Sequence, residues 1–465
     1  MSLATATILP DLARVEPWLK SPLGPAITAP WTEPLLLHGV TGWYFPLSRL
    51  WAMAEMADPK LDTLRPRNMS AAVLDGAVKT VQSASTTAKL ASEAWESAFF
   101  AKRPPGAETL IRLETARRDA AHQFNLTRRL FLALRNRLPG PILWDIVSEQ
   151  ALAGRWEPAL RDPSAAFSAP QVMPGVVEST GVSGPFGRES WLRFTSPRLG
   201  DPVFAHVYSP VGTIDPPTLI YGHGVGVEAE HWRGAIEEAA GLCQRGIRVV
   251  RAEAPWHGRR RLPGNFGGEP MFARGPDGAI EMMAAQAGEI ATLIAWARST
   301  SRGPVAIGGM SLGALAAQLA LVHARRWPKE LRPDAAILCA TCDRLDAVML
   351  DGTLAGAIGL TEAVLAAGWT VPALHRWRAL LEPRGEPAVE PTNLVALIGR
   401  YDRITPYAHG REMMIRWRVP KENLFIRPQG HFGLALGLVR DPAPMLRIAD
   451  VLHRLSGSGP CATLG

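Results

Sequence analysis

The pattern of apolar and polar positions divides the chain into two parts. In the first part, apolar side chains recur three and four positions apart, the spacing of helices that bury one face, over 43–56, 69–102 and 111–138. No pattern typical of a strand occurs before residue 170. We therefore predict an all-helical N-terminal region over 1–156, in which the Pro-rich first 30 residues are irregular.

The rest of the chain carries the short apolar runs that are typical of strands. We predict a linker at 157–189, where Pro, Gly and Ser are dense, and an α/β domain at 190–456. A helical, apolar insertion at 343–390 interrupts this domain between the sixth and seventh predicted strands. The first two strands alternate as an antiparallel pair does, and the others are continuously apolar. Besides the sixth strand, which ends near Cys339, the predicted strands are 191–195, 203–209, 218–221, 246–252, 305–307, 393–398 and 424–426.

The most informative turn follows the apolar run 305–307 and precedes a helix predicted for 314–324. Its sequence, Gly309-Met310-Ser311-Leu312-Gly313, has the Gly-x-Ser-x-Gly pattern of a strand that turns sharply into a helix. Glycine two positions on either side of the serine leaves room for the strand and the helix. The helix N-terminus favours negative charge at the hydroxyl. An ordinary strand–helix turn also fits, but the combination favours Ser311 as a nucleophile.

An acid and a base follow the later strands, in the order Ser, Asp, His. Asp402 comes just after the run 393–398, and His431 comes in a loop after the last predicted strand. We predict that His431 takes and returns the serine proton, while Asp402 orients the imidazole and stabilises its charged form. Asp343 and Asp346, after the sixth strand, compete with Asp402. We favour Asp402 because it directly follows a clear strand.

A glycine-rich segment, Gly222-His223-Gly224-Val225-Gly226, follows the third predicted strand. Acyl transfer requires backbone N–H groups aimed at the oxyanion, and glycine lets the backbone approach it closely. We assign one donor to Val225 or a neighbour and the other to Leu312, the residue after the serine. A glycine-rich strand–helix loop is the plainer interpretation. His223 is predicted to contact substrate or to be structural, rather than to be catalytic.

On these residues, the chain from about Trp191 onward resembles the α/β-hydrolases. The resemblance implies an eight-stranded, mostly parallel sheet with helices on both faces, and an acyl-transfer site that needs no cofactor and no metal. Within the superfamily, Glu253-Ala254-Pro255-Trp256-His257-Gly258-Arg259-Arg260 resembles the Glu-Asn-Pro-Tyr-Tyr-Gly-x-Arg segment of the α/β-hydrolase domain-containing protein 18-like branch. The Asn and both Tyr of that segment are replaced here.

Composition narrows the class of protein. With 47% hydrophobic and 20% charged residues, the chain has the composition of a soluble globular protein. Four cysteines are too few for a disulfide framework, and the pair Cys339 and Cys342 lacks the second pair of a zinc site. The N-terminus has no signal-peptide pattern, and the weakly polar range 354–374 contains Glu362 and Pro372, unlike a membrane span. We expect a cytoplasmic protein.

The chain has a net charge of +7, but it lacks the basic repeats with interleaved aromatic residues that are typical of nucleic-acid binding. We therefore expect no nucleic-acid partner. Basic residues cluster on the predicted helix 111–138, which would either pack on its own domain or dock on an anionic membrane surface. A second cluster, Arg259-Arg260-Arg261, is either a solvated turn or a contact for an anionic substrate group. His257 beside it is predicted to contact substrate too.

These features favour a serine hydrolase that cleaves a carboxylic ester through an acyl-enzyme. We expect the substrate to be a small-molecule or lipid ester. The apolar insertion and the arginines favour an ester with an acyl chain and an anionic head group. If the substrate is such a lipid, we expect peripheral contact with a membrane. Thioester cleavage and acyl transfer use the same intermediate and stay open. A non-catalytic binding protein of the same fold is the alternative class, disfavoured because nucleophile, base, acid and oxyanion loop are all present.

Overall fold

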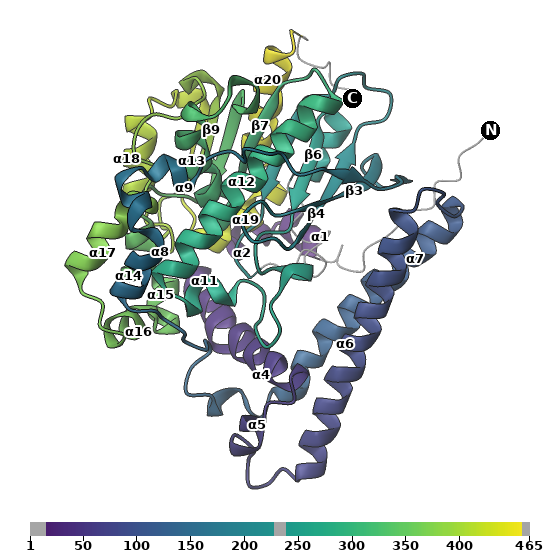
Figure 1. The fold of residues 1–465 in the computed structure, drawn as a ribbon, viewed down its shortest axis with the longest axis vertical. Helices are drawn as coiled ribbons and strands as arrows, with labels where there is room; N and C mark the ends of the chain where they lie inside the picture. The colour runs from purple at the N-terminus through teal and green to yellow at the C-terminus, as the bar shows by residue number, and fades with distance from the viewer. Residues whose placement is uncertain (1–14, 227–238, 458–465) are drawn as a thin grey trace.

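The computed structural model describes residues 15–226 and 239–457. Their fold is α/β, as predicted, with a sheet at the centre and helices against both of its faces (Figure 1). The described strands follow the order β1-β3-β4-β6-β5-β7-β8-β9-β10, with β2 also paired to β3. The longer strands are β3 (Arg188–Thr195), β4 (Pro202–Ser209), β5 (Thr218–Gly222), β6 (Arg248–Ala252), β7 (Val305–Met310), β8 (Ala335–Cys339), β9 (Leu394–Gly399) and β10 (Leu424–Arg427).

These eight strands form the mostly parallel sheet that the resemblance implies. Neighbours from β6 through β5 to β10 pair in parallel, while β4 pairs with both β3 and β6 in the antiparallel sense. The described sheet nevertheless has ten strands, because β1 (Val177–Glu178) and β2 (Val182–Ser183) pair with β3. The predicted count missed them, since two-residue strands carry no periodic pattern.

The continuously apolar strands are explained by burial on both faces. Ile220 and Ile307 join one core, which packs against α12 (Pro276–Thr300) and α13 (Leu312–His323). Their neighbours Leu219 and Ala306 point the other way, into a second core. The second core also receives η5 (Ala240–Arg245), α19 (His431–Arg440) and α20 (Ala443–Leu455).

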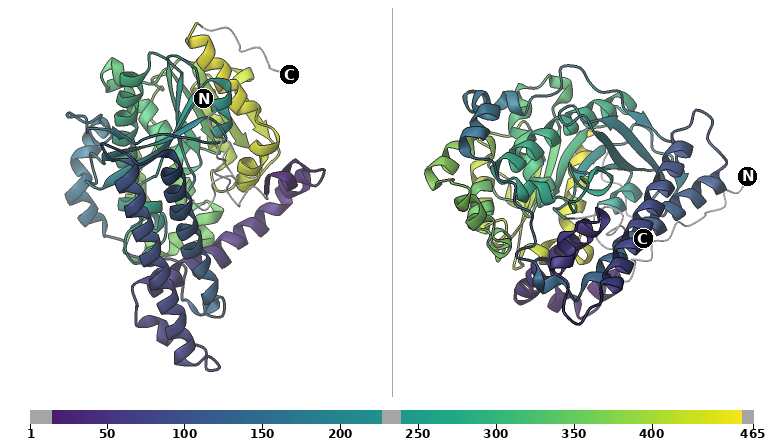
Figure 2. Two further views of the ribbon diagram at one scale, coloured as in Figure 1. Left: turned by 90° about the vertical axis from the view of Figure 1, so that its right-hand side faces the viewer. Right: turned by 60° about the horizontal axis from the view of Figure 1, so that its bottom comes forward.

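All described elements before β1 are helical. They are α1 (Val15–Lys20), α2 (Gly24–Ile27), η1 (Pro30–Thr32), α3 (Glu33–Gly39), η2 (Val40–Tyr44), α4 (Phe45–Glu55), α5 (Lys60–Thr63), α6 (Ala71–Phe99), α7 (Ala107–Leu126), η3 (Thr127–Phe131), η4 (Arg135–Arg137), α8 (Glu149–Arg161) and α9 (Pro163–Ala166). The long helices α6 and α7 pack side by side along one flank of the molecule (Figure 2).

Several predicted boundaries in this region are wrong. Helices α1 and α2 lie within the first 30 residues, which we expected to be irregular; residues 1–14 lie outside the described part. The helix predicted for 111–138 ends at Leu126 and continues as the 3₁₀ turns η3 and η4. Helix α8 crosses the predicted start of the linker at 157, because Leu152 and Trp156 bury one face of it.

The N-terminal helices share their core with the sheet. Phe45 of α4 stacks on Phe266, and Trp156 of α8 donates its indole N–H to Asp277 of α12 at 2.8 Å. Both Phe45 and Trp156 belong to the core that packs one face of the sheet. Residues 157–189, which we predicted to be a linker, hold the end of α8, α9, β1, β2 and the start of β3.

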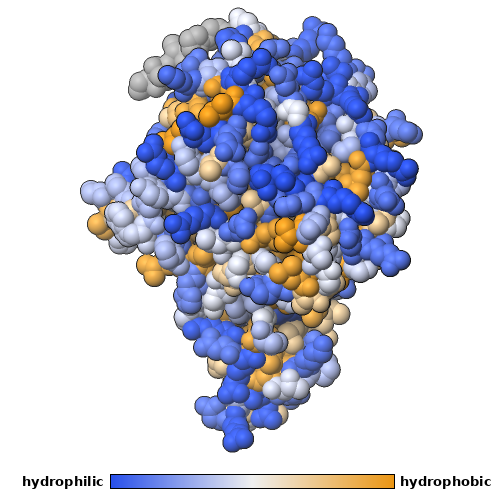
Figure 3. Space-filling view, turned by 90° about the vertical axis from the view of Figure 1, so that its left-hand side faces the viewer, coloured by the Kyte–Doolittle hydropathy of each residue, from blue (hydrophilic) through white to orange (hydrophobic). Residues whose placement is uncertain are grey.

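The insertion at 343–390 is helical, as its pattern indicates. It contains α14 (Leu345–Leu350), α15 (Thr353–Ile358), α16 (Leu360–Ala366), α17 (Val371–Trp377) and η9 (Arg378–Leu380). No single described helix is long and apolar enough to cross a membrane; the pair Leu345–Ile358 and Leu360–Ala366 meets that requirement only together and is bent by 106°. On the side of the molecule where these helices lie, polar residues cover most of the surface and apolar side chains form separate patches (Figure 3).

Shared packing predicts that the helical region and the sheet unfold together. Phe45→Ala and Trp156→Ala should each lower the free energy of unfolding by about 3–5 kcal/mol, because each leaves a cavity in the common core. Leu90→Ala, on an exposed face of α6 (60% exposed), should change it by less than about 0.5 kcal/mol. Urea denaturation followed by circular dichroism measures all three. A separate unfolding step for the helices would contradict this prediction.

Candidate active site

Ser311 lies at a strained turn between β7 and α13. Its φ is +54°, a region that non-glycine residues rarely adopt. A side chain at Gly309 or at Gly313 would overlap backbone atoms, those of Gly313 and Gly222 respectively, so only glycine allows β5, β7 and α13 to approach this closely. The Ser311 N–H donates to the Cys339 carbonyl of β8 at 2.9 Å. The predicted elbow is therefore present, and it presents the hydroxyl at the carboxyl edge of the sheet.

The structure brings the three predicted catalytic residues together. His431 Nε2 lies 2.9 Å from Ser311 Oγ, and His431 Nδ1 lies 2.8 Å from Asp402 Oδ2. All three side chains are buried. Asp402 follows β9, and His431 opens α19 just after β10, so two neighbouring parallel strands deliver acid and base to the edge where the serine sits. The three side chains therefore form a hydrogen-bonded relay from the hydroxyl through the imidazole to the carboxylate.

Asp402 is fixed by donors from its own turn. The N–H groups of Ile404 and Thr405 both donate to Oδ1 at 2.9 Å. The Thr405 hydroxyl donates to Oδ2 at 2.7 Å and lies 3.3 Å from His431 Nδ1. Thr405 was not among the predicted site residues, although a threonine three positions after an aspartate at a turn is a recognisable signal. These bonds hold the carboxylate with one oxygen directed at the imidazole.

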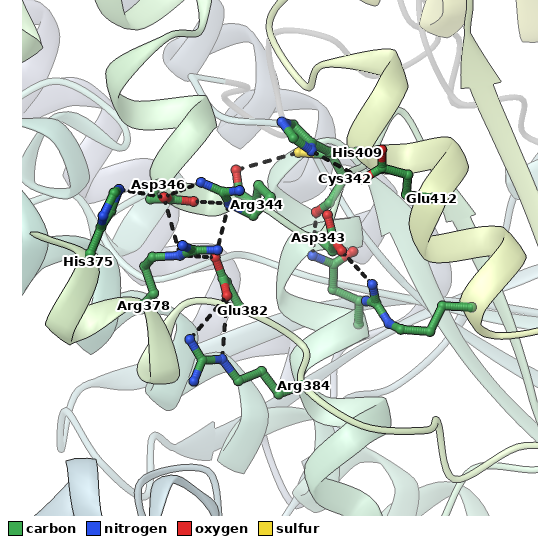
Figure 4. Close-up of polar contacts among 12 residues, drawn as sticks. Cys342, Asp343, Arg344, Asp346, His375, Arg378, Glu382, Arg384, His409 and Glu412 are labelled. Atoms are coloured by element: carbon green, nitrogen blue, oxygen red, sulfur yellow. Dashed lines mark hydrogen bonds and ion pairs between the residues drawn. The ribbon is translucent and has the colours of Figure 1, made fainter.

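The competing carboxylates each pair with an arginine and do not contact His431. Asp343 pairs with Arg416 at 2.7 Å, and Asp346 pairs with Arg344 at 2.7 Å (Figure 4). Burial alone would raise the pKa of Asp346, but the hydrogen bond and charge of Arg344, and the charge of Arg378, outweigh it, so the pKa lies below its usual value. The carboxylate that contacts His431 is Asp402, the one we favoured.

The surroundings of His431 favour its charged form. Burial opposes the imidazolium, but the charge and hydrogen bond of Asp402 outweigh burial, with a further contribution from the charge of Glu33, so the pKa of His431 lies above its usual value. Glu33 belongs to α3 and was not among the predicted site residues. An imidazole with a raised pKa is a stronger base toward the Ser311 hydroxyl.

The predicted oxyanion loop packs directly on the serine turn. The Gly313 N–H donates to the His223 carbonyl at 3.0 Å, and the Gly226 N–H donates to His257 Nε2 at 3.1 Å. Gly226 is therefore engaged, and the role of Val225 as one donor stays a prediction. Leu312 is the first residue of α13, where a backbone N–H has no partner within the helix. The loop continues into residues that lie outside the described part.

Both histidines predicted to contact substrate hold the backbone of this loop. His223 places Nδ1 2.7 Å from the Gly224 carbonyl and accepts the Ala254 N–H at Nε2; His257 Nδ1 lies 2.9 Å from the Pro255 carbonyl. Burial lowers the pKa of His223 to about 4 and that of His257 to about 3, so both rings are neutral near pH 7. His223 still lines the cavity, whereas His257 is corrected from a substrate contact to a structural residue.

The predicted arginine contacts are also largely internal. Arg260 is buried between Asp201 at 2.8 Å and Glu289 at 2.7 Å, and its predicted contact with substrate is corrected because its Nε and both terminal nitrogens donate to these two carboxylates. Arg259 does line the cavity, but it pairs with Glu253 at 2.9 Å and lies over the Phe204 ring. Spacing alone could not reveal the partners of Arg260, which lie 59 and 29 positions away in the sequence.

A cavity of about 560 Å³ opens beside Ser311 and His431. Its wall is mainly apolar, and the apolar insertion, from which we expected an acyl-chain substrate, supplies only a small part of it. The insertion contributes Val348 and Leu354 among the described lining residues. The N-terminal helices contribute more, namely Leu35, Leu36, Gly39, Val40, Tyr44 and Phe45. This contribution could not be predicted, because helix periodicity identifies a buried face but not what that face covers.

No protein-family model matches the chain, and no curated sequence does. Among solved structures, acetyl xylan esterase 1 from Thermoanaerobacterium sp. JW/SL YS485 is similar with 15% identity and a TM-score of 0.43, over 64% of this chain and 96% of that one. An esterase from Pyrobaculum calidifontis is similar with 14% identity and a TM-score of 0.38, over 66% of this chain and 94% of that one. At such values we take function from the chain's own residues.

The contact between Asp402 and His431 predicts that Asp402 is the carboxylate required for turnover. Asp402→Asn should lower kcat for an ester by about 10⁴-fold, because the amide cannot hold the imidazole in the required tautomer or stabilise its charge. Asp343→Asn and Asp346→Asn remove the same charge without touching His431 and should retain most of the activity. Steady-state kinetics with p-nitrophenyl esters measure the three variants. Greater loss in either insertion variant would contradict the assignment.

Proposed function

We propose that the chain is an α/β-hydrolase that cleaves a carboxylic ester through an acyl-enzyme on Ser311. The observation that carries the proposal is the buried relay of 2.9 Å and 2.8 Å from Ser311 through His431 to Asp402, at the wall of an apolar cavity. The closer likeness to the α/β-hydrolase domain-containing protein 18-like branch depends on residues 253–260 and stays a prediction.

The proposed reaction has two halves that use the same residues. His431 Nε2 accepts the Ser311 proton while Oγ attacks the ester carbonyl, and the N–H groups of Leu312 and Val225 stabilise the oxyanion. Asp402 stabilises the imidazolium. Collapse of the intermediate expels the alcohol, which takes the proton back from His431 and leaves an acyl-serine. Water, activated by the same imidazole, then releases the acid and restores Ser311.

We propose an acyl chain on the substrate because the cavity wall is apolar over most of its surface. Phe272, Met271 and Leu315 line it together with the N-terminal helices, and such a wall excludes water from a bound chain. An anionic head group has less support than the sequence suggested, because Arg260 is paired internally and Arg259 already pairs with Glu253. The proposal of a lipid ester therefore rests on the apolar cavity and not on the arginines.

Peripheral contact with an anionic membrane is proposed on a surface of α3, η2, η3 and η4. Leu35 lines the cavity and is 73% exposed, so it lies at the cavity mouth, and Trp31 beside it is 71% exposed. Arg135 lies over the Trp43 ring, which joins η4 to η2. The sequence has no Asp or Glu in 34–54 or in 120–144. Interfacial Trp with basic residues suits an anionic lipid surface, and Glu33, the acidic residue of α3, is engaged with the Phe432 N–H.

The nucleophile is tested directly by the Ser311→Ala variant. We expect a fluorophosphonate probe to label the wild-type chain and not Ser311→Ala, and we expect kcat for p-nitrophenyl butyrate to fall on the order of 10⁶-fold. Circular dichroism of the variant controls for the fold. Labelling or near-full turnover in a folded Ser311→Ala protein would overturn the proposal, as would a wild-type chain that neither reacts with the probe nor cleaves esters of any chain length.

The lipid proposal predicts two further results. Values of kcat/KM should rise from acetyl to longer acyl esters, and the protein should sediment with phosphatidylserine-containing vesicles but not with phosphatidylcholine vesicles. Arg129→Glu with Arg137→Glu should abolish that sedimentation, since each basic residue near the surface contributes about 1 kcal/mol. The matched control is Arg161→Glu with Arg302→Glu, which reverses two exposed arginines elsewhere. An acetyl preference without anionic binding would leave a small-ester hydrolase.

A further inference from the structure

The helix that begins with His431 is packed against the N-terminal segment 28–33. Two glycines make this approach possible. A Cβ at Gly433 would lie 2.7 Å from the Thr28 carbonyl oxygen, and a Cβ at Gly430 would overlap the carboxyl group of Glu33. Helix α19 also contacts α1 and α3. Because α19 also packs on β9, the helix that carries His431 lies between the sheet on one side and the N-terminal segment on the other.

Glu33 reaches the start of this helix and acts as its cap. Its Oε1 accepts the Phe432 N–H at 3.2 Å, and Phe432 is the second residue of α19. The first N–H groups of a helix have no partner within it, and they are usually satisfied by the side chain of the capping residue. Here that residue is Gly430, which has no side chain. Glu33 supplies the missing acceptor from the other end of the chain.

The same carboxylate acts on the imidazole through its charge. Glu33 is half-buried, and burial raises the pKa of its carboxyl group, against the charge of His431 and the backbone N–H of Phe432, which lower it. Among the described residues, the charged groups that act on His431 are Asp402 from the turn after β9 and Glu33 from α3. The two carboxylates differ in contact: Asp402 bonds the ring, whereas Glu33 bonds the backbone that carries the ring.

We propose that Glu33 is a positioning residue of the active site, which fixes the start of the His431 helix and stabilises the imidazolium that forms when Ser311 loses its proton. This proposal rests on the proposed function, because it assigns Glu33 a part in the same proton transfer. It also gives the N-terminal region a role in the reaction. A chain without residues 28–33 would keep Ser311, Asp402 and His431 but would lose the cap of the helix on which the base sits.

Two substitutions separate the charge of Glu33 from its hydrogen bond. Glu33→Gln keeps an acceptor for the Phe432 N–H and removes the charge, whereas Glu33→Ala removes both. The matched control is Glu422→Gln, an exposed carboxylate before β10, at the opposite edge of the sheet from the serine. The full-length variants are compared with wild type for thermal stability, for kcat and KM with p-nitrophenyl butyrate across pH, and for imidazole titration by NMR, in which the His431 signal is assigned from His431→Asn.

The expected results follow from the sign of the charge effect. Activity requires neutral His431, so kcat/KM in the wild type should rise with pH through a pKa above the usual histidine value. Glu33→Gln should move both this kinetic pKa and the NMR titration to lower pH. It should lower kcat at high pH by roughly 3- to 30-fold, with KM little changed, as expected for a charge at a partly buried helix terminus. Glu33→Ala should lose more, and Glu422→Gln should match wild type.

The proposal is overturned if folded Glu33→Gln and Glu422→Gln both give the wild-type pH profile and the wild-type imidazole titration; a stability change without either shift would make Glu33 purely structural. Failure of the proposed function looks different, since the wild-type chain would then lack esterase activity and probe labelling. The NMR titration needs no substrate, so the effect of Glu33 on His431 is decided in that case as well.

Discussion

The close approach of three backbone segments at Gly222, Gly309 and Gly313 is the constraint on which the rest of the site depends. Because no Cβ stands between β5, β7 and α13, the Gly313 N–H can donate to the His223 carbonyl, and the oxyanion loop is tied to the serine turn. The strained φ of Ser311 is tolerated because strand and helix determine the turn from both sides. The serine turn and the glycine-rich loop, to which we assign the nucleophile and the oxyanion donors, are thus placed by one piece of backbone packing.

Three buried histidines lie around this turn, and what each ring faces decides its chemistry. Burial disfavours the charged form of all three and lowers the pKa of His223 and His257, but at His431 the charge and hydrogen bond of Asp402 outweigh burial, so its pKa is raised. His223 and His257 each accept a backbone N–H at Nε2, a bond that only the neutral ring can make, so they serve as fixed parts of the loop. His431 instead faces a carboxylate at Nδ1 and a hydroxyl at Nε2, an arrangement that can accept a proton and hold the resulting charge. The same side chain is therefore a structural link at two positions and a base at the third.

What could be predicted from the sequence was local. The elbow around Ser311 has a characteristic spacing, and Asp402 and His431 each follow a strongly apolar strand, so their meeting at one edge follows from the parallel sheet. The prediction that Arg260 contacts substrate was wrong because its partners, Asp201 and Glu289, lie far away along the chain. Pairing between such distant positions cannot be recognised from local sequence spacing. Glu33 was missed for the same reason: it is a lone acid at a helix start, and its contact with Phe432 exists only once the fold is formed. The linker was misplaced because the Pro and Gly content of 157–189 hid the end of α8 and two short strands.

The position of the N-terminal helices changes what determines selectivity. In the sequence they form a region apart, yet they supply one wall of the cavity through α3, η2 and α4, and Tyr44 donates its hydroxyl to the Gly226 carbonyl of the oxyanion loop at 3.1 Å. One continuous segment, Glu33 to Phe45, therefore touches the acyl cavity, the oxyanion loop and the helix of the catalytic base. A displacement of that segment would alter pocket shape, oxyanion geometry and base position together. Leu36 and Val40 line the cavity on the same continuous segment as Glu33, so under the proposed function a chain bound against them would lie on the segment that caps the His431 helix.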